Sequence, residues 1–236
     1  TASVYGNEKT VGRAVRESSI PREEIFITSK VWNTDQGYES TLSAFDASLN
    51  RLETDYLDLY LIHWPIPAGY EKDYRDLNRE TWKAMERLYK EGQARAIGVS
   101  NFLPRHLEAL MEQADTIPMV NQLEINPRYH QTEAVAFCRE HGILVESWGP
   151  LARGGVLEEP VLRRIADKHK KSVAQICLRW ELQRGIVPLP KSVHADRIKA
   201  NLDVFGFSLD GEDMALIDTL DAPGHYSIHP DHLSEE

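Results

Sequence analysis

The sequence predicts an α/β fold in which short strands of a parallel sheet alternate with helices. Two observations predict it. Short β-branched or aromatic runs alternate with longer segments of helical period along the whole chain, which is the pattern of repeated βα units. The chain has 236 residues and is 42% hydrophobic, and single α/β barrels occupy about 200 to 250 residues. No linker-like stretch divides it, so we expect one domain over residues 1–236.

The first half of the chain supplies three strands and their helices in regular order. Asn7 can cap a first helix, and apolar residues recur at three- and four-residue intervals in a second helix. Gly92 suits the end of a third helix. The expected strands are Ile25–Ser29, Tyr56–Ile62 and Ala94–Val99, and the second and third helices are Tyr38–Leu52 and Arg79–Lys90.

The second half continues the same alternation. Pro104 suits a first helical position, and Gly142 suits a helix stop. The expected strands are Met119–Leu123, Ile143–Ser147 and Gly185–Val187, and the expected helices are Pro104–Gln113, Thr132–His141, Val161–Lys170, Val173–Arg184, Ala195–Val204 and Gly211–Leu220. This gives six strand positions, whereas a closed (β/α)8 barrel needs eight, so two strands are missing upstream.

Charge and composition exclude several classes of protein. The formal net charge is −10 and no Lys/Arg run stands out, which argues against a nucleic-acid surface. No apolar run approaches the roughly 20 residues that cross a bilayer. Cys138 and Cys177 lack paired or metal-ligand spacing, which fits a reducing compartment and buried thiols. We therefore expect a cytoplasmic monomer with no membrane or nucleic-acid partner.

Polar or aromatic residues stand at the ends of five successive predicted strands. Lys30, His63 and Trp148 each follow a strand, Ser100 and Asn101 follow another, and Gln122 lies near the end of its own. In a βα barrel, catalytic groups occupy this rim. A single Lys here is usually a solvated charge and a single His is usually structural. A functional site is therefore indicated by the occurrence of such residues at five successive strand ends, and not by any one of them. An ammonium beside a phenol stabilises the phenolate and lowers the pKa of a Tyr, which makes a proton donor.

Six motifs resemble those of the aldo-keto reductases, in the order and spacing of that family. The similarity extends from Thr1 to about Leu233, and the chain is most similar to the 2,5-diketogluconate reductase and prostaglandin F synthase type. The motifs are Ala2-Ser3-Val4-Tyr5-Gly6-Asn7-Glu8, Ile27-Thr28-Ser29-Lys30-Val31-Trp32, Leu61-Ile62-His63-Trp64-Pro65, Gly98-Val99-Ser100-Asn101-Phe102, Asn121-Gln122-Leu123-Glu124 and Pro190-Lys191-Ser192-Val193.

The resemblance implies NADPH-dependent reduction of small aldehydes and ketones by a tetrad of Asp, Tyr, Lys and His. Tyr5 would be the general acid, Lys30 would tune it, and His63 would orient the substrate carbonyl. Hydride would pass from the nicotinamide to the carbonyl carbon. The Asp of the tetrad would stand directly before Thr1.

The resemblance also implies that this barrel is truncated at its N-terminus. The first strand, the first helix and most of the second strand of the family would be absent. We therefore expect open sheet edges at Ile25–Ser29 and Gly185–Val187 that can associate with other chains, and reduced or no activity of the 236-residue chain.

The resemblance further implies an NADP(H) site. Ser100, Asn101 and Gln122 would hold the nicotinamide carboxamide, and Trp148 would stack on the ring, although it can instead pack in the barrel. The loop from Gly149 to Gly155, including Leu151, would cover the pyrophosphate. A helix start flanked by basic residues binds a phosphate dianion, although Arg197 can also be a solvated charge. The residues that match the 2′-phosphate site are Lys191, Ser192, Val193, Arg197 and Asn201.

Trp32 and Trp64 match aromatic walls of the substrate pocket, and they can equally anchor their loops. His225, His229 and His232 invite a metal site, but Pro230 breaks their helical spacing, so we expect no metal. Two alternatives stay open. A non-catalytic nucleotide-binding or regulatory protein can use the same fold. A metal-dependent hydrolase is disfavoured because no pair of strand-end histidines with a carboxylate occurs.

Overall fold

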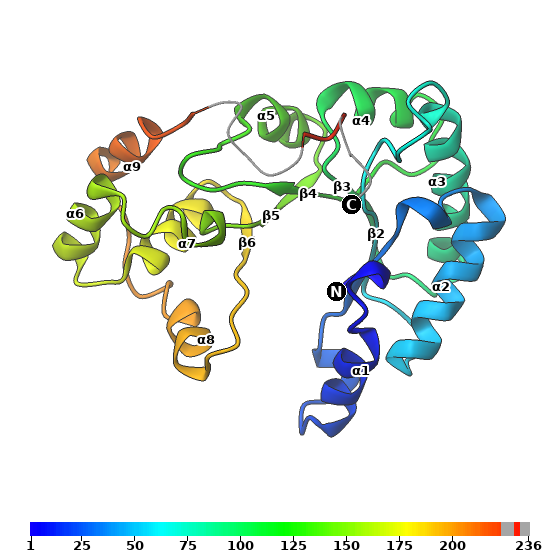
Figure 1. Ribbon diagram of the computed structural model, residues 1–236, viewed down its shortest axis with the longest axis horizontal. Coiled ribbons are helices and arrows are strands. Elements are labelled where there is room, and N and C mark those ends of the chain that lie inside the picture. Colours follow the sequence, from blue (N-terminus) through cyan, green and yellow to red (C-terminus); the bar gives the residue numbers. More distant parts are fainter. Residues whose placement is uncertain (223–228, 232–236) are drawn as a thin grey trace. The chain divides into compact units, whose positions relative to one another are not determined.

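The computed structural model describes residues 1–222 and 229–231, which divide into two compact units. Unit 1 comprises residues 1–121 with 229–231, and unit 2 comprises residues 122–222. Short strands followed by helices make up both units, and Figure 1 labels these elements. The predicted α/β class is therefore confirmed.

Unit 1 contains the first three strands and the first four helices. Its strands are β1 (Thr28–Val31), β2 (Leu59–Ile62) and β3 (Ile97–Ser100). Its helices are α1 (Glu8–Glu17), α2 (Tyr38–Leu52), α3 (Tyr74–Lys90) and α4 (Pro104–Met111). Three short 3-10 helices complete it, namely η1 (Ser3–Tyr5), η2 (Arg22–Glu24) and η3 (Asn33–Asp35).

Strand β4 (Val120–Glu124) begins in unit 1 and ends in unit 2. Unit 2 continues with β5 (Leu144–Trp148) and β6 (Val187–Leu189). Its helices are α5 (Thr132–Glu140), α6 (Pro160–His169), α7 (Val173–Gln183), α8 (Ala195–Leu202) and α9 (Gly211–Asp218), with the 3-10 helix η4 at Ala152–Gly154.

The strands are arranged in the order of the sequence, from β1 to β6. Strand β2 pairs in parallel with both β1 and β3, and β5 pairs in parallel with β6. Parallel neighbours that are consecutive in the chain need a crossover helix between them, and every pair has one or more. The parallel sheet and its six predicted strand positions are confirmed, whereas closure with eight strands stays a prediction.

All six strands begin one to three residues later than predicted. For β1 and β6, polar or helix-end contacts involve the residues just before the observed start. Before β1, the N–H of Ile27 donates to the carboxylate of Asp58, and the N–H of Ile25 donates to the carbonyl of Arg22. Before β6, Gly185 adopts a left-handed φ of 70° at the end of α7. Strands β1, β3 and β5 also end one or two residues later than predicted, so Lys30, Ser100 and Trp148 lie inside strands rather than after them.

The outer edge of β1 is not open along its whole length, contrary to the expectation for Ile25–Ser29. The amino group of Thr1 donates to the carbonyl of Thr28 at 2.8 Å. The hydroxyl of Ser3 donates to the carbonyl of Lys30 at 3.3 Å. The segment that carries Tyr5 is therefore attached along this strand.

Close backbone contacts set the packing of unit 1. A Cβ added to Gly12 on α1 would lie 2.1 Å from the carbonyl oxygen of Leu52 at the end of α2. A Cβ added to Gly98 on β3 would lie 2.4 Å from the carbonyl oxygen of Val120 on β4. Phe45 on α2 meets Tyr60 on β2 edge-to-face, with ring centroids 4.9 Å apart. Helix α1 is thereby seated directly on α2, and α2 on the sheet.

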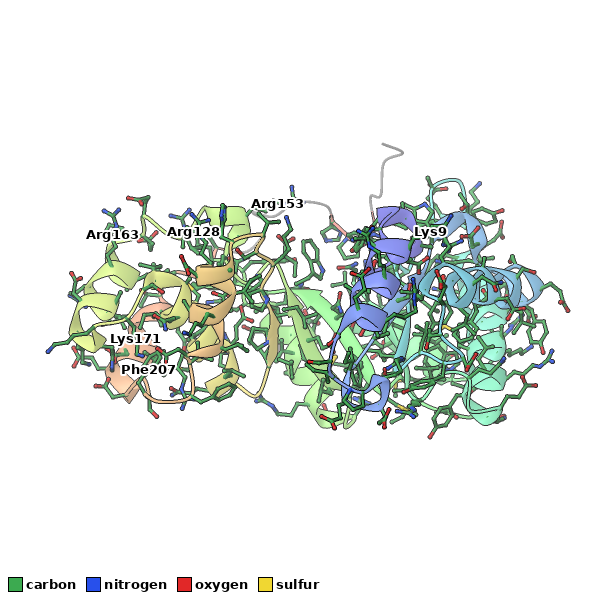
Figure 2. All side chains as sticks on the ribbon, turned by 90° about the horizontal axis from the view of Figure 1, so that it is seen from below. Lys9, Arg128, Arg153, Arg163, Lys171 and Phe207 are labelled. Atoms are coloured by element: carbon green, nitrogen blue, oxygen red, sulfur yellow. The ribbon has the colours of Figure 1, made fainter. Side chains whose placement is uncertain are left out.

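Aromatic and cationic contacts pack the helices of unit 2. Trp180 on α7 is fully buried, with its ring 4.7 Å from that of His130 and 4.7 Å from the guanidinium carbon of Arg184. The ammonium of Lys171 lies 5.4 Å from the ring of Phe207, and Figure 2 labels this pair. In residues 1–222 and 229–231, no helix has both the length and the apolar character needed to cross a membrane.

Replacing Gly12 by Ala tests the seating of α1 on α2. The added methyl group would overlap the Leu52 carbonyl, and backbone cannot move aside cheaply, so we expect a loss of about 1 to 3 kcal/mol in the free energy of unfolding. Gly211→Ala is the matched control, because it also lies in a helix and a Cβ there meets nothing within 4 Å. Equal stabilities of the two variants in urea denaturation would contradict the packing described.

A buried carboxyl group in unit 2 predicts a pH dependence of stability. Glu181 on α7 is fully buried, and burial raises its pKa to about 8. The folded state therefore keeps a proton that the unfolded state has already lost, and Glu181 weakens folding progressively from about pH 4.5 to 8. The Glu181→Gln variant should escape this loss, which is about 1.4 kcal/mol per pH unit within that window.

The comparison is made by urea denaturation of both chains between pH 5 and 8. The stability difference in favour of Glu181→Gln should widen as the pH rises. A difference that stays constant over this range would show that Glu181 ionises normally.

Candidate active site

Three side chains of unit 1 that the sequence singles out lie close together. The hydroxyl oxygen of Tyr5 lies 3.4 Å from Nε2 of His63, and their rings meet edge-to-face. The ammonium nitrogen of Lys30 lies 5.2 Å from the centre of the Tyr5 ring. Lys30 and His63 are buried, whereas Tyr5 is 53% exposed. A phenol that solvent can reach therefore stands against a buried imidazole and a buried ammonium.

The parallel register of β1 and β2 brings Lys30 and His63 to the same face of the sheet. Lys30 is aligned with Leu61, and side chains two residues apart on a strand share a face, so His63 follows Leu61 on that face. The N–H of His63 donates to the carbonyl of Val31, which extends the pairing by one residue beyond β2. Tyr5 comes to the same place on η1, along the edge of β1.

The carboxylate of Glu8, in the first turn of α1, fixes the segment that carries Tyr5. It accepts hydrogen bonds from the hydroxyl of Ser29 at 2.5 Å and from Nε of Arg51 at 2.6 Å. Glu8 is 1% exposed and its bond to Ser29 is buried, so water competes little for the carboxylate, although the Arg51 side chain is itself partly exposed. Because Ser29 precedes Lys30 on β1, one carboxylate holds both the Tyr5 segment and the strand that carries Lys30.

Burial controls the protonation of this group. Burial, followed by the charges of Lys30 and the N-terminal amino group, lowers the pKa of His63 to about 3, so its imidazole is uncharged at neutral pH. Burial also raises the pKa of Tyr5, which is opposite to the lowering that the sequence predicts. The ammonium of Lys30 lies 3.4 Å from the carbonyl oxygen of Thr1, to which it donates. In this structure the cost of desolvating a phenolate exceeds the attraction of the ammonium.

Two tryptophans flank His63. The ring of Trp32 meets it edge-to-face at 5.0 Å, and the ring of Trp64 is stacked with it at 6.3 Å. Trp64 is buried, and its carbonyl accepts a hydrogen bond from Gln36, so it also anchors its loop. Trp32 is only partly buried. The structure brings both residues to the imidazole, and their contact with substrate stays a prediction.

Ser100 and Asn101, at the end of β3, are buried in unit 1. The side-chain amide of Asn101 donates to the carbonyl of His63 at 2.9 Å and to the hydroxyl of Ser100 at 3.1 Å. Asn101 has a left-handed φ of 64°, a conformation that Asn tolerates better than most residues. This pair therefore ties the end of β3 to the backbone that carries the imidazole.

Gln122 and Trp148 belong to unit 2. The amide of Gln122 donates to the carboxylate of Glu146 on β5 at 2.8 Å, and both side chains are buried. Glu146 and Trp148 are two residues apart on β5 and share a strand face. Neither Glu146 nor Glu8 was predicted from the sequence, although a charged residue inside an apolar predicted strand and one inside the first matched motif were available signals.

The loop after β5 has an unusual backbone. Gly149, Ala152, Arg153 and Gly154 all have left-handed φ values, between 46° and 95°. For the non-glycine residues this conformation costs about 1 to 2 kcal/mol each. Leu151 lies within this loop, and Figure 2 labels the exposed Arg153. The segment that matches the family's pyrophosphate cover is thus a tight turn that exposes a positive charge.

The residues of the predicted phosphate site lie on the segment between β6 and α8 and on α8 itself. Lys191, Val193 and Arg197 are exposed, and the hydroxyl of Ser192 accepts a hydrogen bond from the N–H of His194 at 3.1 Å. The first turn of α8 has no side-chain cap, so its N–H groups are available to an anion. In the described residues, neither Lys191 nor Arg197 forms an ion pair, and their joint binding of a phosphate stays a prediction.

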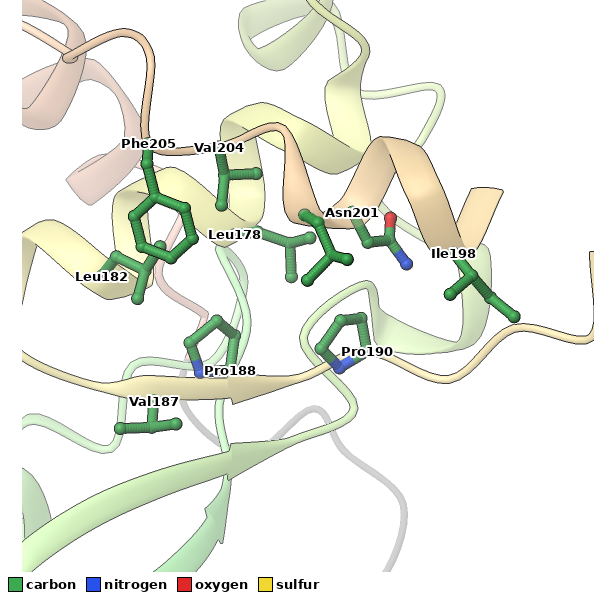
Figure 3. Close-up of a pocket in the computed structure, with 10 residues that line it drawn as sticks. Leu178, Leu182, Val187, Pro188, Pro190, Ile198, Asn201, Val204 and Phe205 are labelled. Carbon is green, nitrogen blue, oxygen red and sulfur yellow. The ribbon is translucent and has the colours of Figure 1, made fainter. Parts of the chain in front are cut away.

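An apolar hollow of about 290 Å³ lies between α7, β6 and α8 (Figure 3). Asn201 contributes the amide among its otherwise apolar lining, which includes Leu178, Pro190, Ile198 and Phe205. Of the residues predicted to contact the 2′-phosphate, Asn201 therefore lines this hollow, whereas Lys191, Ser192, Val193 and Arg197 do not.

The described residues contain no group of three or more His, Cys, Asp or Glu side chains placed to hold a metal ion. His225 and His232, which the sequence analysis weighed as metal ligands, lie outside the described residues.

Residues 1–222 match the model of the aldo/keto reductase family. The chain is 54% identical to the glyoxal reductase of Bacillus subtilis over 99% of its own length and 82% of the relative. It is 47% identical to the 9,11-endoperoxide prostaglandin H2 reductase of Trypanosoma cruzi, over 99% of its length and 81% of the relative. A mutant of Gox0644 solved in complex with NADPH is 43% identical, with a TM-score of 0.91, and covers 100% of this chain and 83% of that one. The chain belongs to the aldo/keto reductase family.

Proposed function

We propose that this protein reduces small aldehydes and ketones, with dicarbonyls such as glyoxal as the substrate class. The observation that carries the proposal is the contact of the Tyr5 hydroxyl with the buried, uncharged His63 beside Lys30. The relative named glyoxal reductase supports the substrate class, because more than half of its aligned residues are identical. We also propose that both units belong to one (β/α)8 barrel domain, which the family and the parallel strand order support.

The cofactor is NADP(H), which bound structures of similar family members contain. The residues of this chain fit it. Ser100, Asn101 and Gln122 offer buried polar groups for a carboxamide. Exposed Lys191 and Arg197 near the uncapped start of α8 suit a phosphate dianion. Trp148, Gly149, Leu151, Ser192, Val193 and Asn201 complete the proposed contacts.

His63 would orient the substrate carbonyl through Nε2. Its Nδ1 is buried and has no hydrogen-bond partner among the described residues. A buried N–H without an acceptor costs more than a lone pair without a donor, so the proton belongs on Nε2. That N–H lies beside the hydroxyl of Tyr5, and a carbonyl oxygen placed next to this pair, within hydrogen-bond distance of both donors, would accept from both.

Tyr5 would then donate its proton to the carbonyl oxygen as that oxygen gains negative charge. The bound cofactor supplies the hydride, and the chain supplies orientation and the proton. Lys30 would favour the resulting phenolate by its charge, because its ammonium lies beside the ring. Trp32 and Trp64, which flank His63, would shield the carbonyl from water.

Replacing Tyr5 by Phe removes the proton donor and keeps the ring. We expect NADPH oxidation with glyoxal to fall by about 10² to 10⁴-fold, while the Kd for NADPH changes less than about twofold. Tyr89→Phe, a solvent-exposed position on α3, is the matched control and should keep its activity. Because the family's Asp precedes this motif, the assay uses the 236-residue chain and the same chain preceded by a relative's upstream segment with that Asp.

Two results would contradict the proposal. One is a Tyr5→Phe variant as active as the Tyr89→Phe control. The other is NADPH binding by both forms of the chain without its oxidation by any dicarbonyl, which would indicate a non-catalytic nucleotide-binding protein.

Replacing Arg197 by Met tests the 2′-phosphate contact. The Kd for NADPH should rise about tenfold or more, because a charge-assisted hydrogen bond is lost, while the Kd for NADH should change less than about twofold. Arg164→Met, on the exposed surface of α6, controls for the loss of charge in the same unit. Binding is measured by calorimetry, and equal losses for NADPH and NADH would place Arg197 elsewhere on the cofactor.

A further inference from the structure

A buried carboxylate in unit 2 determines which way a neighbouring amide faces. The Nε2 atom of Gln122 on β4 donates to Oε2 of Glu146 on β5 at 2.8 Å. The exposed fractions are 4% for Gln122 and 8% for Glu146, so water competes little for this bond. Glu146 also shares a strand face with Trp148. It therefore contacts one proposed nicotinamide ligand and adjoins another.

The chemistry of the carboxylate fixes the Gln122 amide. A side-chain amide can present either its oxygen or its NH2 group to a neighbour, and the two orientations have nearly the same shape. A carboxylate accepts hydrogen bonds and cannot donate them. Glu146 therefore selects the orientation in which the NH2 group of Gln122 faces the carboxylate and Oε1 points away from it. Oε1 has two lone pairs, so it can accept from a ligand in addition to any protein donor.

We propose that Glu146 is a positioning residue that holds the carbonyl oxygen of Gln122 toward the NH2 group of the nicotinamide carboxamide. The inference rests on the proposed function, in which Gln122 contacts that carboxamide. In this role Glu146 would give the site a preference among ligands that Gln122 alone would not provide. Because Oε1 of Gln122 would then face the ligand as a hydrogen-bond acceptor, the site would prefer a ligand with an N–H donor at this position over a ligand of the same shape without one.

The 3-acetylpyridine analogue of NADP⁺ tests this preference, because it carries a methyl ketone in place of the carboxamide and has no N–H donor there. Calorimetry with the 236-residue chain should give a Kd for the analogue about 3- to 10-fold above that for NADP⁺, the range that one neutral hydrogen bond contributes. In Glu146→Gln a carboxylate no longer selects the orientation of the Gln122 amide, because the new side chain offers both a donor and an acceptor, and this ratio should fall below about twofold.

A structural role for Glu146 would weaken both dinucleotides equally and leave the ratio unchanged, which would overturn the inference. Glu181→Gln, the same substitution at another buried position of unit 2, should keep the native ratio. Should Glu146→Gln fail to fold, Glu146→Asp retains a carboxylate on a shorter side chain and should give an intermediate ratio. A native chain that binds both dinucleotides equally also overturns the inference, whereas one that binds neither contradicts the proposed function itself.

Discussion

The carboxylate of Glu8 accepts hydrogen bonds from Ser29 on β1 and Arg51 on α2, and the position of Tyr5 depends on this contact. A buried carboxylate without partners would be costly, so its removal from water requires both donors to stay in place. Gly12, one turn further along α1, allows the helix to touch the backbone of Leu52. Electrostatic and steric constraints thus act on the same helix, and both hold η1 against the edge of β1.

The parallel sheet brings the side chains of the candidate site together. In register, β1 and β2 present Lys30 and His63 on one face, and η1 adds Tyr5 from the strand edge. Residues from three segments of the sequence therefore meet without a long connecting loop. Burial then keeps His63 uncharged, which suits a hydrogen-bond donor to a carbonyl better than a charged acid. Asn101 ties β3 to the same backbone.

Much of the fold was predictable because the signals are local. The helix Tyr38–Leu52 was predicted with its observed bounds, since its apolar residues recur at helical spacing and turn residues flank it. The strand starts were not, because Asp58 and the end of α7 engage residues that look extended in sequence. Periodicity reports which side chains are apolar, and it carries no information about a distant carboxylate that binds the backbone.

In the candidate site, too, some features could be predicted from the sequence and others could not. The motifs identified Tyr5, Lys30 and His63, and the structure brings these three together. Their electrostatics could not be predicted, because the direction of a pKa shift depends on the balance between desolvation and charge, which only coordinates reveal. The pKa of Tyr5 is raised for this reason. Glu8, although it ends the first matched motif, and Glu146 were not predicted because each acts through a contact with a distant element, which the sequence does not reveal.

The most direct test of this account is an NMR titration of the His63 imidazole in the native chain and in Glu8→Ala. Burial, followed by the charge of Lys30, lowers the pKa of His63 to about 3. The native imidazole should therefore stay neutral from pH 8 down to about pH 4. Loss of Glu8 should loosen the Tyr5 segment and move that pKa back toward its ordinary value. A native His63 that titrates near pH 6.5, or a pKa that Glu8→Ala leaves unchanged, would contradict the claim that this carboxylate holds the three side chains together.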